Sequence, residues 1–208
     1  MSPASRVLLL HGIWNARSWL GPLAVRLRRA GLNTEIFGYA SVFGSPDVAV
    51  SSLIKRLRDD GRSVSIIGHS LGGLVALEAL RREPTLPVPR LVCLGSPVCG
   101  SGAARALGRR SWLAPALGRS GALLQRGCDA WSGPTEIGMV AGNVRRGMGQ
   151  FFARFEGDSD GTVAVAETRL EGLQDHCVVA SSHSGLVFSE EAAAQAAHFL
   201  HHGRFMRP

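Results

Sequence analysis

The 208-residue chain contains a single lysine, no long hydrophobic run and no cysteine pattern typical of a metal site. Because Lys55 is the only lysine, almost all of the net charge of +7 comes from arginines, which occur singly or in pairs along the chain. A nucleic-acid-binding domain is expected to concentrate such charge on one element and to carry a recognisable motif, and neither is present. The composition therefore argues against nucleic acid as a partner and leaves open only weak attraction to acidic lipids or polymers.

No segment is apolar over enough residues to cross a bilayer, and the first residues do not resemble an export signal. Only four apolar residues, 7–10, precede His11, which is too few for the hydrophobic region of a signal peptide. In a chain without an export signal, we expect the cysteines to be reduced and buried rather than joined in disulfides. These features predict a cytoplasmic protein without a transmembrane segment. The cysteines are Cys93, Cys99, Cys128 and Cys177.

Length and composition predict one globular domain over residues 1–208, since 45% of the residues are hydrophobic and 19% are charged. Apolar strands alternate with helices long enough to serve as parallel crossover connections. This alternation predicts a three-layer α/β/α sandwich around a mostly parallel sheet of about six strands. Strands are expected within residues 6–12, 34–40, 64–69, 89–97, 135–142 and 175–180, and the principal helices within 15–29, 45–61, 71–82 and 189–201.

The chain is organised around residues 64–77, where an apolar strand leads into a helix through Gly68-His69-Ser70-Leu71-Gly72. A serine in this Gly-x-Ser-x-Gly pattern lies on a turn so sharp that its backbone is strained. Side chains in place of the flanking glycines would collide with the neighbouring strand and helix. The pattern predicts a nucleophile elbow that holds Ser70 above the sheet edge, at the amino end of a helix whose dipole favours negative charge.

With this motif the chain resembles the alpha/beta-hydrolase family, and more narrowly its small bacterial lipase and esterase-like members. Three further features occur in the family's chain order. They are His11-Gly12 after the first strand, Asp160-Gly161-Thr162-Val163 as the Asp-Gly-x-Val that carries the acid, and His183 between the last strand and the last helix. The resemblance implies a catalytic triad of Ser70, Asp160 and His183.

The resemblance also implies an oxyanion hole formed by the backbone N–H groups of Ile13 and Leu71, with His11 supporting that loop through hydrogen bonds. Trp14, which follows Ile13, is a candidate substrate-binding residue that would form a wall of the pocket. Trp19 either forms a second wall or belongs to the core. No metal or organic cofactor is expected, because triad chemistry requires none.

Other acids and bases compete for the triad positions. Asp158 lies in the same loop as Asp160, but only Asp160 occupies the position that the family's motif implies. His176 begins the last strand and should lie toward the opposite sheet edge from Ser70, so it is a poor base. His69, inside the elbow, is expected to pack beside the serine without taking its proton.

The resemblance implies hydrolysis of a carboxylic ester, with a small acyl ester or a lipid as substrate. A thioesterase, amidase, perhydrolase or acyltransferase could use the same triad with a different pocket, and a non-catalytic binding protein could keep the fold. A dehalogenase is disfavoured because that reaction needs aspartate at position 70. Residues 100–133, where the periodicity weakens, form either a lid or acyl-pocket wall or ordinary helices on the sheet. Transient contact with a lipid surface and the oligomeric state stay open.

Overall fold

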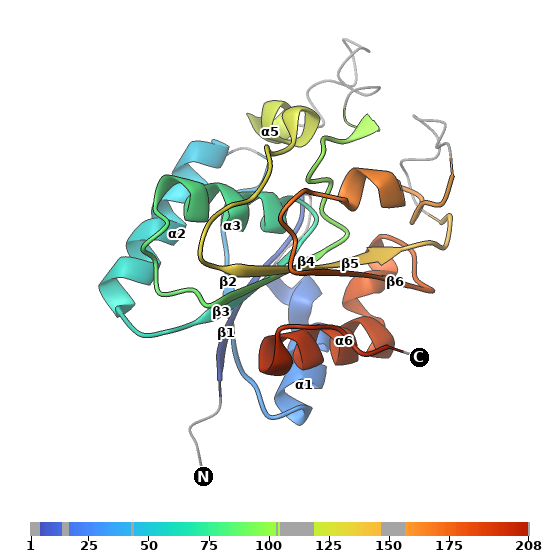
Figure 1. Ribbon diagram of the computed structural model, residues 1–208. Helices are drawn as coiled ribbons and strands as arrows, with labels where there is room; N and C mark the ends of the chain where they lie inside the picture. The colour runs from blue at the N-terminus through green and yellow to red at the C-terminus, as the bar shows by residue number, and fades with distance from the viewer. Residues whose placement is uncertain are drawn as a thin grey trace.

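The computed structural model describes residues 5–13, 17–42, 44–102, 104, 119–146 and 157–207. Its centre is a six-stranded sheet in the order β2-β1-β3-β4-β5-β6, with every neighbouring pair parallel (Figure 1). The predicted parallel α/β architecture is therefore confirmed, and the strand order is new information. The strands are β1 (Arg6–Leu10), β2 (Asn33–Phe37), β3 (Ser65–His69), β4 (Arg90–Leu94), β5 (Glu136–Gly142) and β6 (Asp175–Val179).

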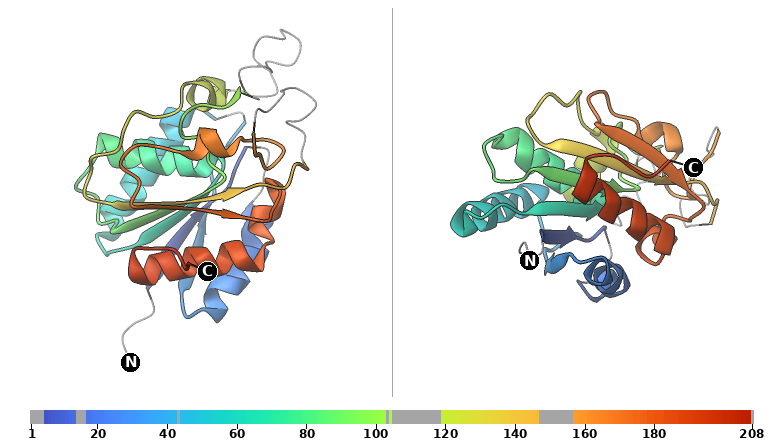
Figure 2. Two further views of the ribbon diagram at one scale, coloured as in Figure 1. Left: turned by 45° about the vertical axis from the view of Figure 1, so that its right-hand side comes forward. Right: turned by 60° about the horizontal axis from the view of Figure 1, so that its bottom comes forward.

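Helices cover both faces of the sheet and complete the three layers (Figure 1 and Figure 2). One face carries α1 (Gly21–Arg29) and α6 (Glu190–His202), and the other carries α2 (Pro46–Asp60), α3 (Leu71–Arg82) and the short α5 (Gly121–Arg126). Short 3-10 turns are η1 (Arg17–Leu20), η4 (Val165–Thr168) and η5 (Ser184–Val187).

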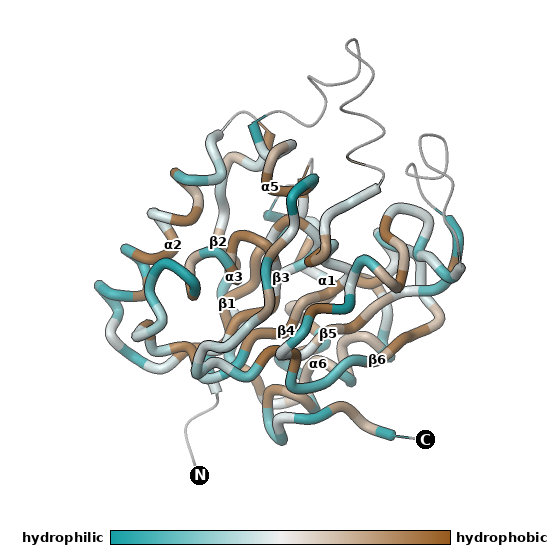
Figure 3. Tube along the Cα trace, turned by 45° about the horizontal axis from the view of Figure 1, so that its top comes forward, coloured by the Kyte–Doolittle hydropathy of each residue, from teal (hydrophilic) through white to brown (hydrophobic). Residues whose placement is uncertain are grey.

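Strands β1, β3, β4 and β5 contribute buried side chains to two separate cores, one under each helical layer. Val7 and Leu9 of β1 pack with α1 and α6, whereas Leu8 and Leu10 pack with α2 and α3. Figure 3 shows hydrophobic residues along β3 and β4, while α2 alternates hydrophobic and hydrophilic residues because only one side of it meets the sheet. Burial on both faces explains why these four strands are mostly apolar, whereas the outer strands β2 and β6 carry polar and exposed residues.

Two helices begin and end at the residues that local signals predict. The Ser45 side chain accepts a hydrogen bond from the Asp47 N–H at the start of α2, and the Ser189 side chain accepts one from the Ala192 N–H at the start of α6. Gly61 and Gly203 end these helices with φ of 61° and 71°, a left-handed conformation that other residues adopt only with strain.

Some predicted boundaries are wrong at the carboxyl edge of the sheet. The first two strands end at Leu10 and Phe37, earlier than the predicted limits of residues 12 and 40. Beyond the sheet, the ring of Tyr39 stacks on His11 at 4.5 Å between centroids, so side-chain contacts replace strand pairing there. The helix predicted for 15–29 begins instead as the 3-10 turn η1 before α1.

All four cysteines are free, but only Cys93 is fully buried as predicted, since Cys128 and Cys177 are half-buried and Cys99 is exposed. Cys99 is exposed because it lies in the loop that leaves β4 beyond the sheet edge, where its thiol donates to the Arg169 carbonyl oxygen at 2.5 Å. Burial raises the pKa of Cys93 and Cys177 to about 12, so these thiols stay protonated and behave as small apolar side chains.

The segment 100–133 is only partly described. Its described parts include α5, which packs against α3, and a loop in which Trp131 is buried and donates from its ring nitrogen to the Thr135 carbonyl oxygen. Residues 103 and 105–118 lie outside the described residues, so a lid or acyl wall in this segment stays a prediction. Among the described helices, none has the length and apolar character needed to span a membrane.

Candidate active site

The turn between β3 and α3 has the strained backbone expected of a nucleophile elbow. Ser70 has φ of 53° and ψ of −119°, and it is the only non-glycine residue with positive φ in the described part of the chain. A Cβ at Gly68 would lie 2.4 Å from the Gly73 nitrogen, and one at Gly72 would lie 2.5 Å from the Leu10 carbonyl oxygen. These are the predicted collisions, one with the helix and one with a strand.

The elbow should therefore be intolerant of a methyl group at its second glycine. We expect Gly72→Ala to lower the free energy of unfolding by about 1–3 kcal/mol, because the methyl group can fit only if the β1 backbone moves. Gly21→Ala, at the first residue of α1, is the matched control, since its Cβ would meet nothing within 4 Å. Denaturant unfolding of both variants checks this, and equal stability of the two would contradict it.

Three predicted residues from distant parts of the chain meet at the carboxyl edge of the sheet. His183 Nε2 lies 3.0 Å from Ser70 Oγ, and His183 Nδ1 lies 2.7 Å from Asp160 Oδ2. All three are buried, with exposed fractions of 6% for Ser70, 8% for His183 and 1% for Asp160. With the carboxylate ionised, Nδ1–H donates to Asp160 and the Nε2 lone pair faces the serine hydroxyl.

The Asp-Gly-x-Val turn explains how the acid is aimed. Asp160 Oδ1 accepts hydrogen bonds from the backbone N–H groups of Thr162 at 2.9 Å and Val163 at 2.7 Å. Gly161, with φ of 88°, lets the chain fold back on the carboxylate. Because Oδ1 is held by the turn, the other oxygen, Oδ2, points at His183.

The side chains of the competing residues take no part in the hydrogen bonds that join Ser70, His183 and Asp160. Asp158 is exposed, and its carbonyl oxygen accepts from the Val165 N–H. His176, at the start of β6, contacts Thr168 Oγ1 at 2.9 Å, and burial lowers its pKa to about 4. His69 is buried beside His183, 3.0 Å from its carbonyl oxygen.

The residues of the predicted oxyanion hole border the elbow. Leu71 is the first residue of α3, so its N–H takes no part in the helix hydrogen-bond ladder. Ile13 is half-buried in the turn after β1, and the start of α3 packs on that strand end, where Gly72 meets the Leu10 and His11 carbonyl oxygens. Trp14 lies outside the described residues.

Tyr39 is a supporting residue that sequence reasoning missed. Its hydroxyl donates to the His11 carbonyl oxygen at 2.5 Å, and its backbone N–H lies 3.5 Å from His11 Nε2. Desolvation raises the pKa of Tyr39 and lowers that of His11, so both rings are neutral at pH 7. The available signal was that Tyr39 is the only tyrosine in the chain and directly follows the second strand.

Trp19 is a surface residue and not part of the core. Its side chain is 39% exposed and meets Phe188, 43% exposed, edge to face with ring centroids 5.4 Å apart. Phe188 directly follows η5, the turn after His183, and Trp19 lies in η1, the turn that precedes α1. The two turns are therefore joined by an exposed aromatic contact.

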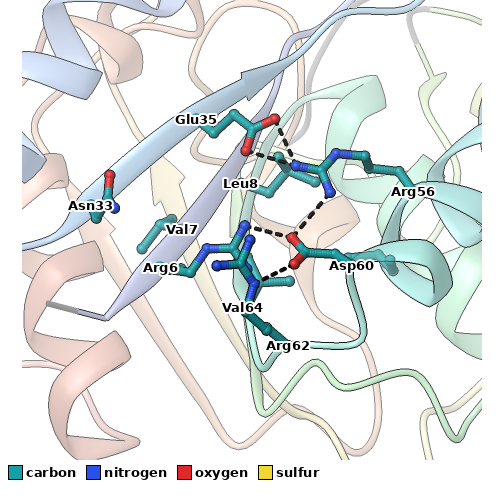
Figure 4. Close-up of a pocket in the computed structure, with 10 residues that line it drawn as sticks. Arg6, Val7, Leu8, Asn33, Glu35, Arg56, Asp60, Arg62 and Val64 are labelled. Atoms are coloured by element: carbon teal, nitrogen blue, oxygen red, sulfur yellow. Dashed lines mark hydrogen bonds and ion pairs between the residues drawn. The ribbon is translucent and has the colours of Figure 1, made fainter. Parts of the chain in front are cut away.

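A cavity of about 260 Å³ lies at the opposite, amino-terminal edge of the sheet (Figure 4). Within it, the Asp60 carboxylate pairs with Arg6, Arg56 and Arg62 at 2.5–3.0 Å. These hydrogen bonds hold the pKa of Asp60 well below its ordinary value of 3.8. Because the arginines are already engaged with Asp60 and with Glu35, the cluster serves to join α2 to β1 and β2.

The described residues contain no group of three or more histidine, cysteine or acidic side chains that could hold a metal ion. The histidines near the carboxyl terminus instead bond locally: His198 Nδ1 lies 2.8 Å from the Arg204 carbonyl oxygen and His202 Nδ1 lies 3.0 Å from the His198 carbonyl oxygen.

Solved structures with the same fold include several hydrolases. A lipase from Bacillus licheniformis, BlEst2 in its mature form, has a TM-score of 0.78 at 21% identity and covers 96% of this chain and 92% of its own. Phospholipase PlaB from Legionella pneumophila has a TM-score of 0.70 at 19% identity, and the match covers 94% of this chain and 57% of PlaB. The type II thioesterase BorB from the borrelidin biosynthetic cluster has a TM-score of 0.64 at 16% identity, and the match covers 97% of this chain and 93% of BorB.

No curated protein matches the sequence significantly. The family model described as "Alpha/beta hydrolase family" matches residues 7–204, which include all but the first residue of β1, the elbow and the loops that carry Asp160 and His183. The parallel sheet and the solved structures agree with that match. The chain therefore belongs to the alpha/beta hydrolase family.

Proposed function

We propose that this protein is a serine hydrolase that cleaves carboxylic esters through an acyl-enzyme. The observation that carries the proposal is the continuous hydrogen-bonded series from Ser70 Oγ through the His183 imidazole to the Asp160 carboxylate, at 3.0 and 2.7 Å. A serine hydroxyl is a weak nucleophile unless a neighbouring base takes its proton. Here the base is within reach of the hydroxyl, and its other nitrogen is held by a buried acid.

The reaction would proceed in two half-reactions. His183 Nε2 takes the Ser70 proton as Oγ attacks the ester carbonyl carbon, and the carbonyl oxygen becomes an anion that the Ile13 and Leu71 N–H groups would stabilise. When the tetrahedral intermediate collapses, His183 returns the proton to the leaving alcohol and the acyl group stays on Ser70. Water then repeats both steps and releases the acid. Asp160 keeps Nδ1 protonated and stabilises the imidazolium.

Labelling with a fluorophosphonate probe, read by intact mass, tests this proposal directly. We expect one adduct, mapped to Ser70, together with turnover of nitrophenyl esters whose acyl chains are graded in length. Ser51→Ala, on an exposed turn of α2, is the control and should label fully. Turnover without a Ser70 adduct, or an adduct on a different serine, would contradict the proposal. An adduct without ester turnover would show that Ser70 is activated but that the substrate is not a simple ester. Thioesters, amides and acyl transfer would then be tested next.

Thioester hydrolysis is the second candidate, since one neighbour in fold is a type II thioesterase. The attack on the carbonyl is the same for both substrates, and only the leaving group differs. Pairs of esters and thioesters with the same acyl group separate the two: a kcat/KM at least tenfold higher for the thioester would favour the second candidate.

A further inference from the structure

We propose that His69 is a positioning residue that holds the backbone of His183, so that the base keeps its place between Ser70 and Asp160. This inference rests on the proposed function, because it assigns His69 a part in the same site. His69 ends β3 and directly precedes Ser70. Its imidazole does not reach the serine hydroxyl as a base; it contacts the loop that carries the base.

The backbone of His183 is held at both of its polar groups. Its carbonyl oxygen lies 3.0 Å from His69 Nε2, and its N–H donates to the Asp160 carbonyl oxygen at 2.9 Å. A second hydrogen-bonded series, from the His69 side chain through the His183 backbone to the Asp160 carbonyl oxygen, therefore runs beside the side-chain series of the triad. The residue next to the nucleophile and the acid itself both anchor the base.

The geometry determines which nitrogen of His69 carries the proton. A carbonyl oxygen can only accept, so Nε2 must carry the hydrogen and Nδ1 must be the bare acceptor. The ring is 2% exposed, and its centroid lies 5.0 Å from that of His183. Desolvation first, and the nearby His183 second, lower the pKa of His69 to about 3, so the ring is a neutral donor throughout the range in which the enzyme would work.

Stability alone does not explain a histidine at this position. His69 Nδ1 is buried and has no hydrogen-bond partner in the described part of the structure. An unpaired buried acceptor costs free energy, whereas an apolar ring of similar shape would leave none unpaired at that atom. Among the residues that the structure describes, the imidazole makes one polar contact, the one to His183. A histidine that leaves one nitrogen unpaired and uses the other to hold His183 points to a role in placing the base.

Three variants test the proposal, with kcat and KM measured separately. His69→Phe keeps an aromatic ring but removes the donor, so we expect kcat to fall tenfold to a hundredfold, as for about an ångström of misplacement at a catalytic group, with KM within about twofold. His69→Gln extends an amide N–H toward the position of Nε2 and should restore kcat to within about threefold of wild type. His176→Phe, at a half-buried histidine outside the site, should leave kcat within about twofold.

Two further measurements separate positioning from folding and from the proposed function. Thermal unfolding of His69→Phe should stay cooperative with a Tm close to that of the wild type, because removal of the unpaired Nδ1 offsets the loss of the donor to the His183 carbonyl oxygen. The nitrogen-bound proton resonance of His183 Nδ1, assigned by its loss in His183→Gln, should broaden or shift in His69→Phe and recover in His69→Gln. This signal needs no substrate, so it reports on His69 even if no ester is hydrolysed. Wild-type kcat in His69→Phe, an unchanged His183 signal, or failure of His69→Gln to restore either would overturn the proposal.

Discussion

Replacing either Ser70 or His183 with alanine is expected to lower kcat for ester hydrolysis by roughly a million-fold, the largest effect we predict for this protein. The reason is that the two side chains act as one unit: the hydroxyl attacks only as the imidazole, 3.0 Å away, takes its proton. The double variant should therefore be no slower than either single variant. Steady-state kinetics with a nitrophenyl ester, on protein repurified to exclude contaminating esterase, measures all three. Independent, additive losses would show that the two residues do not work together.

The acid is expected to contribute less than the other two members of the triad. Asp160→Asn should lower kcat by about ten-thousand-fold, because an amide at this position no longer favours the Nδ1–H form of His183. Asp158→Asn is the matched control, two residues away and exposed, and should keep wild-type kcat. A large loss in Asp158→Asn with activity retained in Asp160→Asn would reverse the assignment of the acid.

Lowering the pH is expected to destabilise the fold before the pH reaches the range in which carboxylates become protonated. Burial lowers the pKa of His69 to about 3 and that of His176 to about 4, from an ordinary value of 6.5. As the pH falls below 6.5, the unfolded chain binds protons that the folded chain cannot, so stability is lost. Each histidine then costs about 1.4 kcal/mol per pH unit, and together they remove about 5 kcal/mol between pH 7 and pH 4.5. That is a large part of the stability of an ordinary domain.

Urea unfolding at pH 7, 6, 5 and 4.5 measures this loss. In His176→Phe the slope of stability against pH should be about half of the wild-type slope, because one of the two strongly shifted histidines is gone. The Asp60 cluster acts in a different window, since its carboxylate has a lowered pKa and its contribution is lost only as the pH falls below 3.8. Stability that is constant from pH 7 to pH 4.5 would show that these histidines are accessible to protons in the folded state.

Much of this protein follows from residues that are close together in the chain. The cap at Ser45, the glycine at Gly61, the elbow around Ser70 and the Asp160-Gly161 turn all depend on backbone and side-chain groups within a few residues of each other. Their positions were therefore predictable from local pattern. The chain order of serine, acid and histidine is also a property of the sequence, and it sufficed to propose the triad.

The tertiary structure decided which distant groups meet and how deeply they are buried. The contact of Tyr39 with His11, the exposure of Cys99 and Trp19, and the anchoring of His183 by His69 join segments that are far apart along the chain or depend on where a loop leaves the sheet. Hydrogen-bond partners and desolvation are set by such long-range packing. A histidine in the sequence thus indicates a group that can titrate, and only the fold determines whether it serves as base, neutral donor or buried support.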